Sequence, residues 1–355
     1  MELLPNVTRA CVVDRLVTDI YFPWRPCRAA AMAIRYHMDD KPLVSIGMPV
    51  YNGRRFIGRA LDSLLAQTHA DFELTISDNA STDGTREICQ DYAAADKRIR
   101  YGRSERNRGA AWNFNQVLGM ARGEYFMWAA ADDVWEPSYV AAMLENLRAN
   151  PQAALSFCAF DNIDENGRQV KTYPHLFDLP SPRLEKRLRN YMMQEEHLGK
   201  ANPIYGLMSR RATRTFKGFE TAREIWGQDM LVVFQLLSMG RLVLAPDVLF
   251  HKRLEVQPSR QTQEPKKRDF RVLVEATARV FSIISERRRY FRGYALLVES
   301  FDALTATEKR KLQIMRRRRA LRLYREEIRQ GLLVPIMRRI AENKNLVVSK
   351  NRKHE

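Results

Sequence analysis

Two adjacent carboxylates, Asp132 and Asp133, follow directly after the apolar run FMWAAA at residues 126–131. Apolar runs of this kind are typical of buried strands, and a buried strand does not tolerate an unpaired charge. Either the chain leaves the sheet at Asp132, or a cation neutralises the carboxylates. The alternative to a ligand-binding role is that these carboxylates cap the helix that follows Pro137.

Two further polar clusters also follow apolar runs. PVYNG (49–53) ends the run LVSIGM, and SDNASTDGT (77–85) ends the run FELTIS. Pro, Asn, Asp and Gly are ordinary turn residues, so turns and helix caps are an alternative explanation for both clusters. The placement of all three polar clusters at strand ends indicates a binding site.

The elements that would position these clusters alternate between strand and helix. The expected strands are 43–48, 72–77, 98–103 and 124–130, and the expected helices between them are 54–68, 86–95 and the segment from the loop at 107–109 through 120. This alternation is the signature of a doubly wound, parallel α/β sheet. Ligands bind beyond the carboxyl ends of the strands in such sheets.

The second half of the pattern is less regular. We expect a helix at 139–148, a strand at 154–160, a hairpin with Asn166-Gly167 as its turn, a helix that ends at Gly240 and strand-like structure at 241–253. From about residue 263 the chain is expected to be helical and basic.

Four stretches together resemble the family 2 glycosyltransferases: VSIGMPVYNG, SDNASTDGT, NRGAAWNFNQVLGMARGEYFMWAAADDVWEP and GQDM. The resemblance covers roughly residues 42–256. It implies a GT-A type nucleotide-sugar fold, with a mostly parallel sheet and helices on both faces. It also implies an inverting transfer of a sugar from a nucleotide-diphosphate donor.

The resemblance assigns a set of residues to the donor site: Pro49, Tyr51, Asn52, Asp78, Asn107, Asn113 and Asp132. Tyr51 matches the aromatic side chain that stacks on the nucleobase in the family. Asp78 matches the Asp that accepts a hydrogen bond from the imide of uracil, which favours a UDP- or dTDP-sugar. Asn107 and Asn113 fall in the pattern N-x-G-x-x-x-N, which lines the donor pocket in the family.

The resemblance also implies a divalent metal. Asp132 and Asp133 match the last two residues of the family pattern D-x-D-D, whose carboxylates suit Mn²⁺ or Mg²⁺. Such a cation neutralises the departing diphosphate. His251 matches a segment near the diphosphate and is the third candidate ligand. Ala130 replaces the first Asp of the pattern, which leaves open which carboxylate binds the metal.

Asp229 in GQDM is the implied catalytic base. It matches the second acidic residue of the family's Glu-Asp pair, with Gln228 in place of Glu. An inverting transfer needs one carboxylate that removes the proton of the acceptor hydroxyl. The N-terminus of a helix favours negative charge, so a plain helix cap is the alternative role for Asp229.

The positive charge is concentrated at the end of the chain. The formal net charge is +17, and positions 251–355 hold 28 Lys and Arg against 12 Asp and Glu. A basic helical region can be a solvated surface, a membrane-docking surface or, less in keeping with this sequence, a nucleic-acid surface.

The chain lacks an apolar run of about 18 residues and a signal peptide, so we expect a cytoplasmic protein, with peripheral contact at the inner face of the membrane left open.

These observations divide the chain into an extension at 1–40, a catalytic domain at 41–256 and a basic helical region at 257–355. The catalytic domain is expected to have a nucleotide-binding half at 41–150 and an acceptor half at 151–256. We expect a glycosyltransferase of cell-surface glycan assembly, acting on a glycan or lipid-linked acceptor. The alternatives are a degenerate nucleotide-sugar-binding protein, which Ala130 favours, and a nucleotidyltransferase, which would need a Gly-rich loop that PVYNGRR does not supply.

Overall fold

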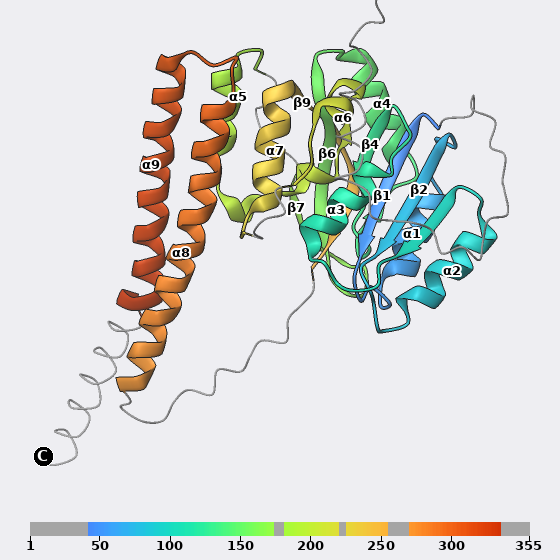
Figure 1. The fold of residues 1–355 in the computed structure, drawn as a ribbon, viewed down its shortest axis with the longest axis horizontal. Helices are drawn as coiled ribbons and strands as arrows, with labels where there is room; N and C mark the ends of the chain where they lie inside the picture. Colours follow the sequence, from blue (N-terminus) through green and yellow to red (C-terminus); the bar gives the residue numbers. More distant parts are fainter. Residues whose placement is uncertain (1–41, 174–180, 220–224, 255–269, 335–355) are drawn as a thin grey trace, which may run out of the picture. The chain divides into compact units, whose positions relative to one another are not determined.

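The first four strands form a parallel sheet in the computed structural model, which describes residues 42–173, 181–219, 225–254 and 270–334. The order of strands is β3–β2–β1–β4, and helices α1, α2 and α3 connect them (Figure 1). The bounds are β1 Val44–Val50, α1 Ile57–Leu65, β2 Phe72–Asp78, α2 Thr85–Ala95, β3 Ile99–Arg103, α3 Ala110–Gly119 and β4 Tyr125–Trp128. Each strand is within a few residues of its prediction, although β4 ends two residues before Ala130.

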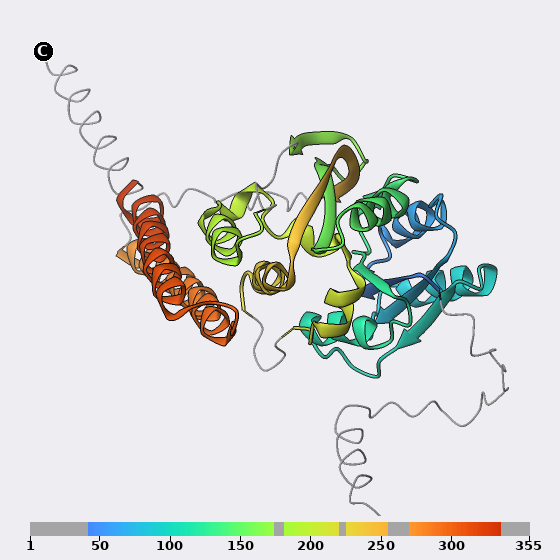
Figure 2. The same ribbon diagram turned by 90° about the horizontal axis from the view of Figure 1, so that it is seen from above.

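The sheet continues through strands that come from later in the chain. Strand β8 is antiparallel to both β4 and β6, whereas β6 and β9 are parallel over ten residue pairs. The bounds are β5 Val134–Trp135, α4 Tyr139–Ala149, β6 Ala153–Ile163, β7 Gln169–Tyr173, β8 Leu207–Met208, α6 Arg210–Thr215, α7 Gln228–Met239 and β9 Arg241–Arg253. The two predicted halves of the catalytic domain therefore share one sheet, which has helices on both faces (Figure 2).

Burial explains why these segments form strands. All seven side chains of β2 and all eleven of β6 are buried, so both faces of the sheet are covered. Parallel strands that are covered on both faces read as near-continuous apolar runs. The register pairs Val50 with Asp78, which brings the carboxyl ends of β1 and β2 to one edge.

The basic end of the chain forms a helical hairpin of α8 (Phe270–Ser300) and α9 (Ala306–Ile328), which we call the C-terminal hairpin. A capping box of Thr305 and Glu308 starts α9. The hairpin contacts α7 and α5 (Leu184–Met193). No described helix is long and apolar enough to cross a membrane. The extension at 1–40 and the domain boundary at 256 lie outside the described residues.

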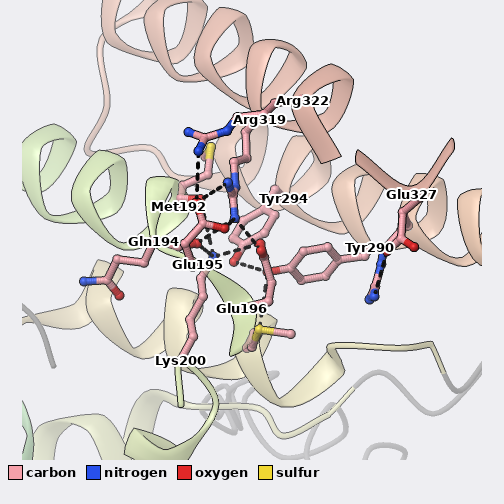
Figure 3. Close-up of polar contacts among 12 residues, drawn as sticks. Met192, Gln194, Glu195, Glu196, Lys200, Tyr290, Tyr294, Arg319, Arg322 and Glu327 are labelled. Atoms are coloured by element: carbon pink, nitrogen blue, oxygen red, sulfur yellow. Dashed lines mark hydrogen bonds and ion pairs between the residues drawn. The ribbon is translucent and has the colours of Figure 1, made fainter. Parts of the chain in front are cut away.

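A buried charge cluster joins the hairpin to α5. Arg319 of α9 is 1% exposed and forms ion pairs with Glu195 and Glu196, which follow α5 (Figure 3). Lys200 is fully buried, and its amine lies 3.5 Å from Glu196 and within 6.0 Å of three tyrosine ring centroids. Burial lowers the pKa of Lys200 to about 8. The hairpin is thus packed against α5 and α7.

Candidate active site

A cavity of about 280 Å³ lies beyond the carboxyl end of β1. Residues predicted for the donor site line it from two separate segments. They are Pro49 at the end of β1, Tyr51 and Asn52 just after it, and Asp132 after β4. The fold therefore brings four predicted donor residues into one cavity, at the sheet edge where ligands of parallel sheets bind.

The loop that carries Tyr51 is held in place by the neighbouring loop. The side-chain oxygen of Asn52 accepts the backbone N–H of Thr82 at 2.9 Å, and the backbone N–H of Asn52 donates to the Ser81 hydroxyl at 2.9 Å. Asn52 has a φ of 53°, a left-handed conformation that Asn tolerates. Tyr51 itself remains 50% exposed, so a flat aromatic face is available at the cavity.

Asp78 is fully buried at the end of β2 and is not among the residues that line the cavity. Its carboxylate accepts the backbone N–H of Ser81 at 2.7 Å and the Tyr101 hydroxyl at 2.8 Å, and Arg103 lies 3.4 Å away. Asp78 therefore orders the loop after β2. Its predicted contact with the nucleobase stays a prediction.

Asn107 and Asn113 also support loops rather than line the cavity. The Asn113 amide donates to the carbonyls of Val50 and Ser77, which ties the ends of β1 and β2 together. The Asn107 oxygen accepts from Asn79 at 2.9 Å. Both residues place the donor loops, and direct contact with a donor stays a prediction.

The two adjacent carboxylates have different surroundings. Asp132 lines the cavity, and its carboxylate has no hydrogen-bond partner among the described residues. Asp133 is fully buried, and its carboxylate accepts the backbone N–H of Arg253 at 2.8 Å and the amine of Lys252 at 3.2 Å. Burial raises the pKa of Asp133 to about 6, and the charge of Lys252 opposes that rise.

Lys252 is a site residue that the sequence reasoning missed. Its amine lies 5.0 Å from the ring centroid of Tyr205, which lines the cavity. Burial acts to lower the pKa of Lys252, but the carboxylate of Asp133 outweighs it and the pKa is raised. A positive charge therefore lies next to a residue that lines the cavity. Its only signal in the sequence is a basic residue at the end of the strand FHKR.

The ring of His251 lies between two other carboxylates. Its Nδ1 lies 2.6 Å from Asp161 and its Nε2 lies 2.9 Å from Glu136. Burial acts to lower the pKa of His251, but these two carboxylates outweigh it and raise the pKa. Both ring nitrogens of His251 are thus engaged by carboxylates, and its role as a metal ligand stays a prediction.

The described residues partly fit a divalent cation. No group of three His, Cys, Asp or Glu side chains among them is placed to hold a metal. Asp133 is paired with Lys252, which leaves Asp132 as the accessible carboxylate at the cavity. Hard cations bind oxygen ligands, so Asp132 suits a metal whose other ligands come from donor phosphates and water.

Asp229 is the second residue of α7 and is partly buried. Its Oδ1 accepts the backbone N–H of Met230 at 2.8 Å. Burial raises its pKa, and the charge of Lys252 opposes that rise. In its ionised form, a carboxylate with a raised pKa accepts a proton more readily than an ordinary Asp does.

Comparisons with known proteins agree with these features. Residues 45–213 match the model of glycosyl transferase family 2. The putative teichuronic acid biosynthesis glycosyltransferase TuaG of Bacillus subtilis (strain 168) is 36% identical over 135 residues, which cover 38% of this chain and 53% of TuaG. The chain thus spans about half the length of this curated relative. These matches support membership of glycosyltransferase family 2, and they are consistent with a glycosyltransferase.

Solved structures show the same GT-A type fold. The S. aureus TarS 1–349 structure in complex with UDP-GlcNAc has a TM-score of 0.58 and 17% identity, over 81% of this chain and 74% of that chain. The mannosyltransferase PcManGT from Pyrobaculum calidifontis, in complex with GDP-Man and Mn²⁺, has a TM-score of 0.50 and 19% identity, over 87% of this chain and 81% of that chain. The predicted fold class is therefore confirmed.

Proposed function

We propose that this protein is an inverting glycosyltransferase that moves a sugar from a UDP- or dTDP-sugar to a hydroxyl group of a cell-surface glycan or its lipid-linked precursor. The observation that carries the proposal is the shared cavity of Tyr51 and Asp132 at the end of β1, in a chain whose residues 45–213 match glycosyl transferase family 2. The relative TuaG is named as a putative glycosyltransferase of teichuronic acid biosynthesis, which supports a cell-surface glycan as the class of acceptor.

Each side chain has one task in the proposed reaction. Tyr51 stacks on the nucleobase, and Asp132 would hold Mn²⁺ or Mg²⁺. The cation, when bound, neutralises the charge that develops on the leaving group. Asp229 removes the proton from the acceptor hydroxyl while the oxygen of that hydroxyl attacks the anomeric carbon. The bond from the anomeric carbon to the diphosphate oxygen breaks, and the nucleoside diphosphate leaves.

Lys252 adds a permanent positive charge to this site. Its amine is paired with Asp133 and lies near Tyr205. A cation in a site with little water acts on nearby negative charge more strongly than it would in bulk water. We propose that Lys252 stabilises the ionised form of Asp229. Burial raises the pKa of Asp229, and the charge of Lys252 limits that rise.

The C-terminal hairpin is proposed to contact anionic membrane. Four arginines follow one face of α9 and the turn after it at helical spacing: Arg318, Arg322, Arg325 and Arg329. Leu321 is 54% exposed and Ile328 is 38% exposed on the same helix. Each basic residue near an anionic leaflet contributes about 1 kcal/mol. A variant with Arg318, Arg322 and Arg325 changed to Gln should float less with phosphatidylglycerol vesicles, whereas equal flotation would contradict docking.

A donor screen tests the function. The purified chain is incubated with UDP-, dTDP- and GDP-sugars, with Mn²⁺ or with excess EDTA, and the released nucleoside diphosphate is measured. We expect turnover of a UDP- or dTDP-sugar that Mn²⁺ supports. Release from none of the donors, together with no binding of UDP by calorimetry, would contradict the proposal.

A further inference from the structure

Helix α8 lies directly against the start of α7, where Asp229 stands. Gly293 of α8 faces Leu231, and a Cβ at Gly293 would lie 2.4 Å from the Leu231 side chain. Gly227 has a φ of 77°, and a Cβ there would lie 2.9 Å from the ring of Tyr290. Close backbone approach at two glycines fixes the distance between α8 and the turn that leads to Asp229.

The turn before α7, residues 225–227, is also held by two side chains of α8. The guanidinium carbon of Arg287 lies 3.2 Å from the ring centroid of Trp226. The ring of Tyr290 packs edge-on against Trp226, with centroids 5.1 Å apart and an interplanar angle of 81°. A cation–π contact that is shielded from water is stronger than an exposed one, so it favours one conformation of this short turn.

Helix α8 is itself anchored at this position. The Tyr290 hydroxyl lies 2.8 Å from the Tyr294 hydroxyl, and the Tyr294 ring packs edge-on against Phe234 of α7 at 4.7 Å. Both tyrosines lie beside Lys200 in the buried charge cluster that Arg319 completes (Figure 3). Contacts to Phe234 of α7 and to Lys200 therefore hold the side of α8 that faces the 225–227 turn.

We infer that α8 is a positioning element for Asp229, in which Arg287 and Tyr290 hold the 225–227 turn so that the carboxylate keeps its place at the start of α7. The inference rests on the proposed function, because it gives Asp229 the role of base. Arg287 and Tyr290 act through the turn and are positioning residues. The C-terminal hairpin is then required for turnover, whether or not a membrane is present.

The test compares Arg287→Gln with Arg287→Lys in the full chain. Two control variants are Glu327→Gln, which removes the Arg287 ion pair at 3.4 Å but keeps Arg287 on Trp226, and Arg288→Gln, which changes an exposed arginine of the same helix. The readouts are kcat, KM for the donor, the UDP dissociation constant and the pH dependence of kcat.

We expect Arg287→Gln to lower kcat on the order of 10-fold or more, since small misplacements of a catalytic group are costly. The UDP dissociation constant should be unchanged, and the acid limb of the kcat profile should move because the surroundings of Asp229 change. Arg287→Lys should recover most of kcat, because it keeps a cation over the ring. Both controls should behave like the unmodified protein.

Two results would overturn the inference. One is a kcat for Arg287→Gln equal to that of the unmodified protein, and the other is a loss that Glu327→Gln reproduces in full. If Arg287→Gln does not fold, Trp226→Leu removes the other partner of the contact, and an unchanged kcat in that variant overturns the inference as well. The Asp229→Asn variant separates the positioning role from the proposed function. Full kcat in Asp229→Asn would reject the proposed function. A loss of kcat in Asp229→Asn, together with full kcat in the Arg287 variants, would reject only the positioning role.

Discussion

Lys200 should make the protein more stable as the pH rises above neutral. Its side chain is fully buried, and burial lowers its pKa from an ordinary 10.5 to about 8, even though Glu196 lies beside it. Between these two values the unfolded chain binds a proton that the folded chain has lost. Stability therefore rises with pH across this window, and below about 8, where both states bind the proton, Lys200 no longer makes stability depend on pH.

The size of the effect follows from the two pKa values. The full difference corresponds to about 3 kcal/mol, of which about 2 kcal/mol is expected between pH 7.5 and pH 9.5. The pKa values of Tyr191, Tyr290 and Tyr294 are raised well above 10 by burial, so these neighbours remain neutral in that window. The pKa of Glu195 is lowered and that of Arg319 is raised, so both keep their charges there.

The assay is urea unfolding, followed by tryptophan fluorescence at both pH values, for the unmodified protein and for Lys200→Met. The unmodified protein should gain about 2 kcal/mol more than the variant between pH 7.5 and pH 9.5. Lys217→Met, at an exposed position, is the matched control and should follow the unmodified protein. A difference between the unmodified protein and Lys200→Met that is the same at both pH values would refute the reasoning.

Three more predictions concern the candidate site. Tyr51→Ala should weaken UDP binding by about 1–3 kcal/mol, the value of one stacked base, with no change in the unfolding midpoint; calorimetry that shows equal affinity would contradict stacking. Asp133→Asn should cost about 3 kcal/mol of stability because it leaves the Lys252 charge without its partner, and Lys252→Met in the same chain should restore most of that loss in urea unfolding. The pKa of His251 is raised, so its contribution to stability is present below the ordinary His range and is lost as the pH rises through the raised value; a difference between the unmodified protein and His251→Gln that does not shrink with rising pH would exclude it.

The parallel part of the fold could be predicted from the sequence because its signals are local. Strands β1 and β2 are continuous apolar runs, and the helix between them shows an apolar stripe of period 3.6. Strands β5 and β8 have two residues each and exist because Trp135 pairs with Phe250 and Phe126 pairs with Met208. Such pairings join distant parts of the chain, so no local pattern indicates them.

The same limit applies to the candidate site. Polar residues at strand ends predicted a shared binding site for Tyr51 and Asp132, and both side chains line one cavity. The different surroundings of Asp132 and Asp133 could not be predicted, because Lys252 is 119 positions from Asp133 in the sequence. The partners of His251 are 90 and 115 positions away. The resemblance at His251 could therefore not indicate that Asp161 and Glu136 flank its ring, and its role as a metal ligand stays a prediction.

The kinetics of Asp229→Asn test the central claim most directly. Asn keeps the size of the side chain and its contact with the start of α7, but it cannot accept the proton of an acceptor hydroxyl. With a donor and acceptor pair identified by the screen, we expect kcat to fall by about 10²–10⁴-fold while the UDP dissociation constant is unchanged. A variant that retains the kcat of the unmodified protein would show that Asp229 is not the base and would contradict this account.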